Sequence, residues 1–175
     1  MLIRRAAEAD IDAVERLYDE IHTAEEAGKQ TTGWIWNVYP VRDTARAAIK
    51  RKELFVLEEA GQIWGAGIIN NTQADCYQWG KWKYAALDEQ VCVLHTLVIS
   101  PAHSRKGYGS AFLEFYEQYA RETGCIALRM DTNVKNKTAR NLYRKRGYEE
   151  AGVVPTCFQG IPNVQLVLLE KRLMI

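Results

Sequence analysis

A tyrosine, a histidine and a glycine-containing loop are the residues of this chain whose types and spacing suit group-transfer chemistry. Tyr143 lies in a segment with helical periodicity, and a tyrosine with its usual pKa of about 10 stays protonated at pH 7 and can act as a general acid. His95 lies in an otherwise apolar stretch, and its usual pKa of about 6.5 leaves it mostly neutral at pH 7 and able to accept a proton. Alternatively, Tyr143 is only a core tyrosine and His95 is only a hydrogen-bonded histidine of the core.

The glycine loop follows a segment that reads as a buried strand. Val91 to Ile99 is almost wholly apolar and β-prone, which is typical of a strand covered on both faces. Residues 104–110 are rich in small side chains and precede a helical pattern. A helix N-terminus leaves N–H groups unpaired and carries partial positive charge, so glycines there let a phosphate approach. The sequence therefore predicts an anion-binding loop, with an ordinary strand-to-helix turn as the alternative.

Two common phosphate-binding motifs do not match this loop. The dinucleotide-binding fingerprint needs a third glycine, and Phe112 stands in its place. The P-loop ends in Gly-Lys-Ser/Thr, whereas this loop reads Gly109-Ser110-Ala111. We therefore expect neither a Rossmann-type site nor a P-loop.

The order of the expected elements indicates the fold class. Strands are expected over residues 2–6, 54–57, 63–69, 91–99, 125–130, 148–154 and 164–169. Helices are expected from Asp10 or Asp12, from Asp43, after the glycine loop and from Asn136. Residues 131–133 are expected to end one strand, residues 155–163 to form a loop, and residues 70–90 to form an extended hairpin arm or an active-site flap. This order predicts one α/β (α+β) domain over residues 1–175, a mixed central sheet with helices on both faces.

Composition argues against several other classes of protein. The chain has 175 residues, of which 47% are hydrophobic and 26% charged, and its net charge is +1; neither nucleic acid nor a membrane is therefore an expected partner. Its apolar runs are far shorter than the roughly 18 residues of a membrane span, and its first residues do not read as a secretory signal. The four cysteines lack CxxC spacing: Cys76, Cys92, Cys125 and Cys157. We expect free thiols, no metal and a cytoplasmic location.

Two motifs give a specific resemblance. The stretch LVISPAHSRKGYG resembles motif A of the GNAT superfamily of N-acetyltransferases, with Gly107 and Gly109 in place and Ser104 where the family usually has Arg or Gln. The stretch NKTARNLYRKRGY resembles motif B of the same superfamily. Its matching residues are Asn136, Ala139, Leu142, Tyr143, Gly147 and Tyr148. The resemblance covers nearly the whole chain and is weakest over residues 28–52 and 70–90.

The resemblance implies a cofactor, acetyl-CoA, held between splayed central strands. The implied cofactor-binding residues are Leu97, Val98, Ile99, Ser104, Arg105, Lys106, Gly107, Tyr108, Gly109, Ser110, Asn136, Ala139, Arg140 and Tyr143. The loop would hold the pyrophosphate mainly through backbone N–H groups, and Tyr143 would lie near the thioester sulfur. Arg140 is included only because its positive charge could approach the cofactor's phosphates. Alternatively, it lies on a solvated face of its helix.

The resemblance also implies an amine acceptor and its site. Tyr143 would be the general acid and His95 the general base, a position at which some members of the superfamily carry a histidine. The acceptor pocket is expected among aromatic loops, at Trp34, Trp36, Tyr39, Trp82 and Phe158, where a small apolar or cationic acceptor fits better than an acidic peptide. Asp131 could orient the acceptor ammonium, or it could have only a turn-forming or capping role.

The expected activity is direct transfer of an acetyl group from acetyl-CoA to a primary amine of a small acceptor. The alternatives are transfer of a different acyl group, transfer to an alcohol or a protein, and a catalytically idle CoA-binding regulator. The intact Tyr143 favours an enzyme. Dimers are frequent in the superfamily, so a homodimer is also implied.

Overall fold

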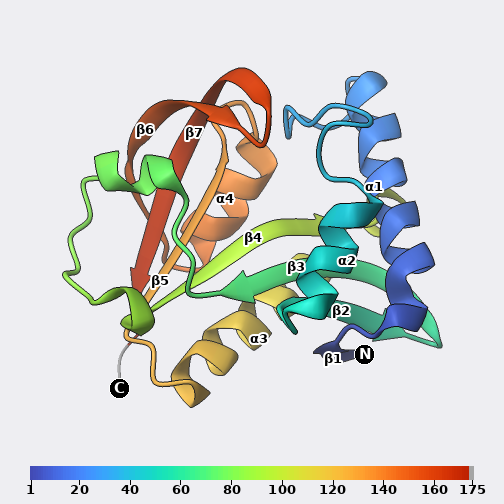
Figure 1. Cartoon of the computed structure of the whole chain (residues 1–175), viewed down its shortest axis with the longest axis horizontal. Coiled ribbons are helices and arrows are strands. Elements are labelled where there is room, and N and C mark those ends of the chain that lie inside the picture. Colours follow the sequence, from blue (N-terminus) through green and yellow to red (C-terminus); the bar gives the residue numbers. More distant parts are fainter. Residues whose placement is uncertain (174–175) are drawn as a thin grey trace.

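The computed structural model describes residues 1–173, whose seven strands form one mixed β-sheet. The strands are β1 (Leu2–Arg5), β2 (Leu54–Glu59), β3 (Gln62–Asn70), β4 (Val91–Ile99), β5 (Ala127–Asn133), β6 (Glu149–Phe158) and β7 (Ile161–Arg172). Their order across the sheet is β1-β2-β3-β4-β5-β7-β6. β4 and β5 are parallel neighbours and the other pairs are antiparallel. The predicted mixed sheet is therefore confirmed (Figure 1).

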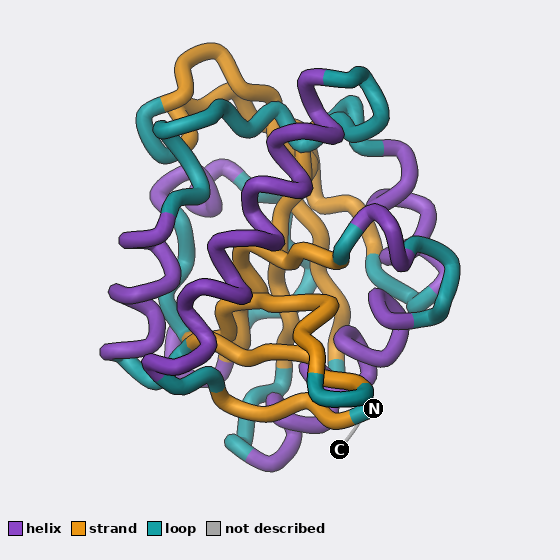
Figure 2. The backbone as a smooth tube through the Cα atoms, turned by 90° about the vertical axis from the view of Figure 1, so that its right-hand side faces the viewer, coloured by secondary structure: helices purple, strands orange, loops and turns teal. Residues whose placement is uncertain are grey.

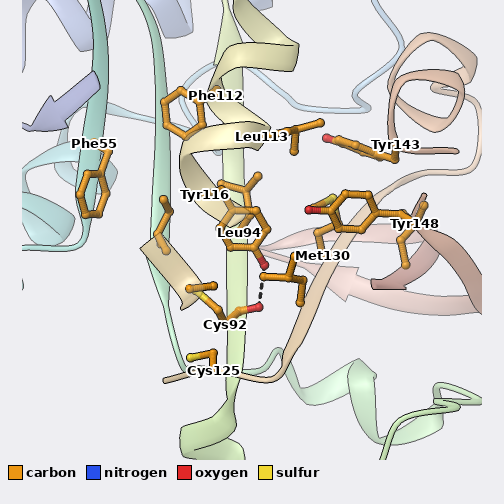
Figure 3. Close-up of a cluster of buried hydrophobic side chains, with 14 of the residues drawn as sticks. Phe55, Cys92, Leu94, Phe112, Leu113, Tyr116, Cys125, Met130, Tyr143 and Tyr148 are labelled. Atoms are coloured by element: carbon orange, nitrogen blue, oxygen red, sulfur yellow. Dashed lines mark hydrogen bonds between the residues drawn. The ribbon is translucent and has the colours of Figure 1, made fainter. Parts of the chain in front are cut away.

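Within residues 1–173, four α-helices cover the two faces of this sheet (Figure 2). They are α1 (Ile11–Glu26), α2 (Arg42–Lys50), α3 (Tyr108–Glu122) and α4 (Lys137–Lys145). α1 and α2 bury their apolar sides against β2 and β3, whereas α3 and α4 share a second cluster, shown in Figure 3, in which the Tyr116 hydroxyl donates to the Cys92 carbonyl oxygen at 2.6 Å. None of the helices within residues 1–173 is long and apolar enough to cross a membrane.

β4 and β5 separate halfway along their length. They pair only from Val91 to Leu94 of β4, and β4 then continues as far as Ile99 without further ladder bonds to β5. A gap therefore opens between two neighbouring strands in the middle of the sheet, where backbone groups of β4 face open space. The expected splay of the central strands is present.

A β-bulge lies in β4 where this gap opens. In the ladder with β3, His95 pairs with Ile68 but Val98 pairs with Ala66, so β4 contains one extra residue. Thr96 has a φ of +51° at this point, which is a costly conformation for a β-branched residue. Because a bulge re-aims the side chains of its strand, it sets the directions of His95 and Thr96.

Two expected boundaries are wrong. β5 does not end before Asp131 but continues two residues past it, because it keeps pairing with β7. The expected loop over residues 155–163 is a hairpin, in which β6 and β7 are joined at Gln159 and Gly160. β6 tolerates Pro155 because it is an edge strand, where one row of N–H groups needs no ladder partner.

Residues 71–90 pack along the sheet and do not form a hairpin arm. They contain two short 3-10 turns, Asp75–Trp79 and Asp88–Gln90. Tyr77 and Trp82 join the apolar cluster of β5, β6 and β7. The Arg129 guanidinium of β5 lies 4.2 Å from the centre of a ring of Trp82, so a cation–π contact holds the segment in place.

Replacing Trp82 with Ala is expected to lower the free energy of unfolding by about 3 kcal/mol. The substitution removes its packing, the cation–π contact and the hydrogen bond from the indole Nε1 to the Tyr77 carbonyl oxygen at 2.7 Å. Urea denaturation measures the loss. Trp82→Phe keeps an aromatic ring beside Arg129, so its free energy of unfolding should fall less. Equal stability of the wild type and the two variants would show that Trp82 does not hold the segment.

Candidate functional site

A groove of about 620 Å³ runs between α3 and α4, along the open end of β4. Of the residues expected to bind a cofactor, those that line it are Leu97, Ile99, Ser104, Arg105, Gly107, Tyr108, Gly109, Ser110, Asn136, Ala139 and Tyr143. Val98, Lys106 and Arg140 are not among its lining residues. The Arg140 guanidinium instead binds the Glu150 carboxylate at 2.8 and 2.9 Å and the Val134 carbonyl oxygen at 2.9 Å.

The glycines of the loop shape one wall of this groove. Gly107 precedes α3 with a φ of +82°, a conformation that L side chains rarely adopt. Gly109 lies so near α4 that an added Cβ would be 3.1 Å from the Leu142 Cδ2. The first turn of α3 therefore faces the groove with its backbone, and its unpaired N–H groups can bind an anion.

Sequence reasoning missed several residues that line the groove. On α4 they are Thr138, Asn141, Leu142 and Lys145, and in the connection between α1 and α2 they are Gln30 and Thr32. The α4 residues recur at helical spacing beside Ala139, so the periodicity of motif B could have identified them. Nothing local distinguishes Gln30 or Thr32.

A second, smaller cavity of about 90 Å³ opens from the groove. Six residues line both spaces: Thr32, Trp34, Leu97, Asn136, Ala139 and Tyr143. His95, Asp131 and Phe158 line the small cavity alone. The structure therefore brings the expected acid, the expected base and part of the expected acceptor site to one place.

Three of the expected acceptor-site aromatics do not line this cavity. Trp36 stacks on the buried His22, with ring centroids 4.8 Å apart. Tyr39 lies behind the cavity, with its ring edge-on to Phe158 at 5.3 Å and its hydroxyl hydrogen-bonded to Thr96. Trp82 packs on Arg129, as described above. Of the three, Tyr39 alone is seen to contact lining residues of the cavity in the described part of the chain, namely Trp34, Thr96 and Phe158.

Tyr143 is buried where the two spaces meet, with 6% of its surface exposed. Burial raises the pKa of its hydroxyl well above the usual value, and the Asp131 carboxylate raises it further. The hydroxyl is therefore fully protonated at neutral pH and can donate only to a strongly basic atom. Figure 3 shows the Tyr143 ring beside Tyr148, and the two ring centroids are 6.1 Å apart.

His95 is held by a chain of polar groups. Its Nε2 lies 3.0 Å from the Asn70 Oδ1, and the Asn70 amide donates to the Glu53 carboxylate at 3.1 Å. Burial lowers the pKa of His95, although a hydrogen bond with the backbone of Thr72 opposes this. His95 is therefore a neutral, oriented imidazole at pH 7.

Asp131 is the carboxylate of the small cavity. The Tyr77 hydroxyl donates to its Oδ2 at 2.8 Å. The surrounding protein raises the pKa of Asp131 to about 6, and the bond from Tyr77 limits this rise. Sequence reasoning missed Tyr77, which comes from the segment whose course it did not predict.

Comparison with known proteins identifies relatives over part of the chain. The model of the acetyltransferase (GNAT) family matches residues 12–148. YhfO, an uncharacterized N-acetyltransferase of Bacillus subtilis, is 34% identical over 70 residues, which are 39% of this chain and 47% of YhfO. A streptothricin acetyltransferase from Escherichia coli is 26% identical over 85 residues, which are 49% of this chain and 49% of that protein. The chain thus spans about half the length of the curated relatives it matches.

Solved structures agree over nearly the full length. An acetyltransferase of the GNAT family from Streptococcus agalactiae has a TM-score of 0.82 at 23% identity and covers 99% of this chain and 96% of its own. The yncA protein of Salmonella typhimurium, solved with its cofactor acetyl-CoA, has a TM-score of 0.70 at 22% identity and covers 100% and 95%. These structures show a shared fold, and the family model spans most of the chain. The chain belongs to the acetyltransferase (GNAT) family.

Proposed function

We propose that this chain transfers an acetyl group from acetyl-CoA directly to a primary amine of a small acceptor. The observation that carries the proposal is the meeting of two spaces at Tyr143: a long groove beside a helix N-terminus and a small cavity. A long phosphorylated cofactor fits the first and an acceptor head group fits the second. The acetyl-CoA bound in the yncA structure supports the choice of donor.

The cofactor would lie along the groove with its pyrophosphate at the first turn of α3. Its pantetheine arm would follow the side of β4 that no longer pairs with β5, near Leu97 and Ile99, and Asn136 and Ala139 would flank it from α4. The Asn136 side chain already accepts a hydrogen bond from the Ala139 N–H at 3.1 Å, so its amide N–H group remains to donate to the cofactor.

The catalytic groups answer three needs of acetyl transfer. The acceptor nitrogen must lose protons, because its lone pair is the nucleophile, and the neutral His95 can accept one of them. The thioester oxygen gains negative charge in the tetrahedral intermediate, and N–H groups of β4 between Leu97 and Ile99 can stabilise it. The leaving thiolate needs a proton, which the Tyr143 hydroxyl supplies.

A thiol-release assay tests this function. Acetyl-CoA is offered with a panel of amines, polyamines, amino acids, alcohols and peptides, and the release of CoA is followed. Release with amines would support N-acetyl transfer and identify the acceptor class. Calorimetric binding of CoA without release from any acceptor would favour the idle CoA-binding regulator, and release with a longer acyl-CoA alone would favour a different donor.

His95→Gln is expected to lower kcat/KM by about 100-fold, because a general base contributes on that order or more. The wild-type rate should fall as the pH drops through the lowered pKa of His95, since only the neutral imidazole accepts a proton. The variant should lose this part of the pH dependence. An unaltered pH profile would show that His95 is only structural.

We also place this activity in the cytoplasm. The four cysteines are free, and Cys76, Cys92 and Cys125 are buried. Free thiols suit a reducing compartment. Fractionation of the producing cells would test this location.

A further inference from the structure

The small cavity contains one carboxylate and no lysine or arginine among its described lining residues. The carboxylate belongs to Asp131, on the part of β5 that continues past the ladder with β4. Its Oδ2 accepts the Tyr77 hydroxyl, and the second oxygen has no hydrogen bond from the protein among the described residues. A half-buried carboxylate with a free oxygen and no cationic partner has lost part of its hydration, and a cation that enters the cavity would compensate for that loss.

The cavity walls suit the uncharged part of such a cation. Trp34 and Phe158 line it, and Tyr39 packs edge-on against both rings, at 5.9 and 5.3 Å. Aromatic rings beside a carboxylate attract an ammonium group and exclude an anion. If the ligand carried a carboxylate next to its amino group, that carboxylate would meet no lysine or arginine among the described lining residues of the cavity.

We propose that Asp131 binds the acceptor ammonium and takes its first proton, so that the enzyme selects small amines that carry no carboxylate beside the amino group. This inference rests on the proposed function and names the substrate class of the same site. Tyr77 is the positioning residue, because its hydroxyl fixes one oxygen of Asp131 and leaves the other for the ligand.

The proton steps balance with groups already in the site. An ammonium N–H bond breaks and its proton moves to Asp131; the freed amine attacks the thioester carbon, so that a C–N bond forms and the C–S bond breaks. Tyr143 protonates the thiolate, and His95 takes the second proton from nitrogen. One of these two protons then returns to Tyr143 and the other leaves to solvent.

The electrostatic surroundings permit the first step. Tyr77 is the one side chain that shifts the pKa of Asp131 among the described residues. The Asp131 carboxylate in turn raises the pKa values of the Tyr39 and Tyr143 hydroxyls and of the Cys76 thiol, and His95 lies on the cavity wall. Burial disfavours both the carboxylate and the ammonium, and it thereby narrows the gap between their pKa values. The raised pKa of Asp131, about 6, reflects this.

The first test compares matched acceptors in the full chain. Phenethylamine and histamine are assayed against phenylalanine and histidine, which differ from them by the carboxylate. We expect a kcat/KM about 100-fold higher for the amines, since an unpaired buried charge costs on the order of 3 kcal/mol. Preference for the amino acids would overturn the inference while leaving N-acetyl transfer intact; no thiol release from any acceptor would overturn the proposed function.

The second test uses Asp131→Asn, with Asp43→Asn on the exposed side of α2 as the matched control. Asp131→Asn should lower kcat/KM for the amines about 100-fold and leave the Kd for acetyl-CoA unchanged. Calorimetry should show wild-type amine binding weaken about tenfold from pH 7 to pH 5, as a pKa of about 6 requires, and the variant should lose this dependence. Full activity of Asp131→Asn would overturn the inference.

A melting curve separates this role from a structural one. The folded pKa of Asp131, about 6, lies above its usual value, so ionisation of the carboxylate lowers the free energy of unfolding as the pH rises from about 4 to about 6, and the full cost is present above that window. Asp131→Asn should therefore melt at a higher temperature than wild type at pH 8, with the difference shrinking at pH 5. A lower melting temperature at pH 8 would mark Asp131 as a residue that serves folding.

Discussion

The Tyr143→Phe enzyme is expected to turn over about 100- to 1,000-fold more slowly than wild type with acetyl-CoA and its amine acceptor. Phenylalanine keeps the buried ring and its packing against Tyr148 but cannot protonate the leaving thiolate. Because the hydroxyl lies where the groove and the cavity meet, its loss should change kcat far more than the Kd for acetyl-CoA. Steady-state kinetics and calorimetry measure the two quantities.

Two comparisons make this result specific. An acyl donor whose leaving thiol has a low pKa needs no proton, so the variant should recover much of its rate with such a donor. Tyr148→Phe, which removes a buried hydroxyl 3.4 Å from the Glu117 carboxylate, serves as the control and should keep its kcat. Equal kcat for Tyr143→Phe and wild type would remove Tyr143 as the acid.

Gly109→Val is expected to weaken acetyl-CoA binding by at least about 100-fold. A Cβ at this position would lie 3.1 Å from Leu142, and a branched side chain would fill the groove between α3 and α4. The cofactor's phosphates would then lose backbone N–H bonds, each worth roughly 1.5–3 kcal/mol to a charged group. Calorimetry gives the change in Kd, and circular dichroism checks that the fold survives.

A double variant identifies the cause of that loss. If pressure on Leu142 closes the groove, Gly109→Val with Leu142→Ala should recover part of the affinity. If the valine blocks the phosphates directly, the double variant should bind as poorly as the single one. Retained affinity in Gly109→Val itself would mean that the cofactor lies elsewhere.

Local chemistry explains which parts of the fold were predictable. The strand over residues 91–99 and the glycine loop were both evident, because apolar β-prone residues and glycines restrict the backbone whatever surrounds them. The helix with Ala139 and Tyr143 was predictable from its period. Residues from these three predictable segments line the groove together.

The parts that sequence missed depend on distant contacts. The hydrogen bond between Tyr77 and Asp131 joins residues that are 54 apart in the chain, and no local sequence pattern predicts it. The course of residues 71–90 depends on Arg129, a residue of another strand. Pro155 suggested a loop because its place on an edge strand is set only by the assembled sheet. The charge of Arg140 suggests a phosphate ligand, but its partner is the Glu150 carboxylate, which the fold brings beside it.

The early end of the β4–β5 ladder divides the sheet into two parts, here called plates, and the proposed catalytic groups lie on different plates. His95 belongs to the plate of β1 to β4, whereas Asp131 belongs to the plate of β5, β7 and β6, to which α4 and Tyr143 are attached. The plates share a short backbone ladder at one end, and beyond it the described residues form no further β4–β5 ladder bond that fixes the proposed acid relative to the proposed base. A ligand that spans the gap would contact both plates and hold them together. Occupancy of the groove would thus set the alignment of the catalytic groups as well as the thermal stability of the protein.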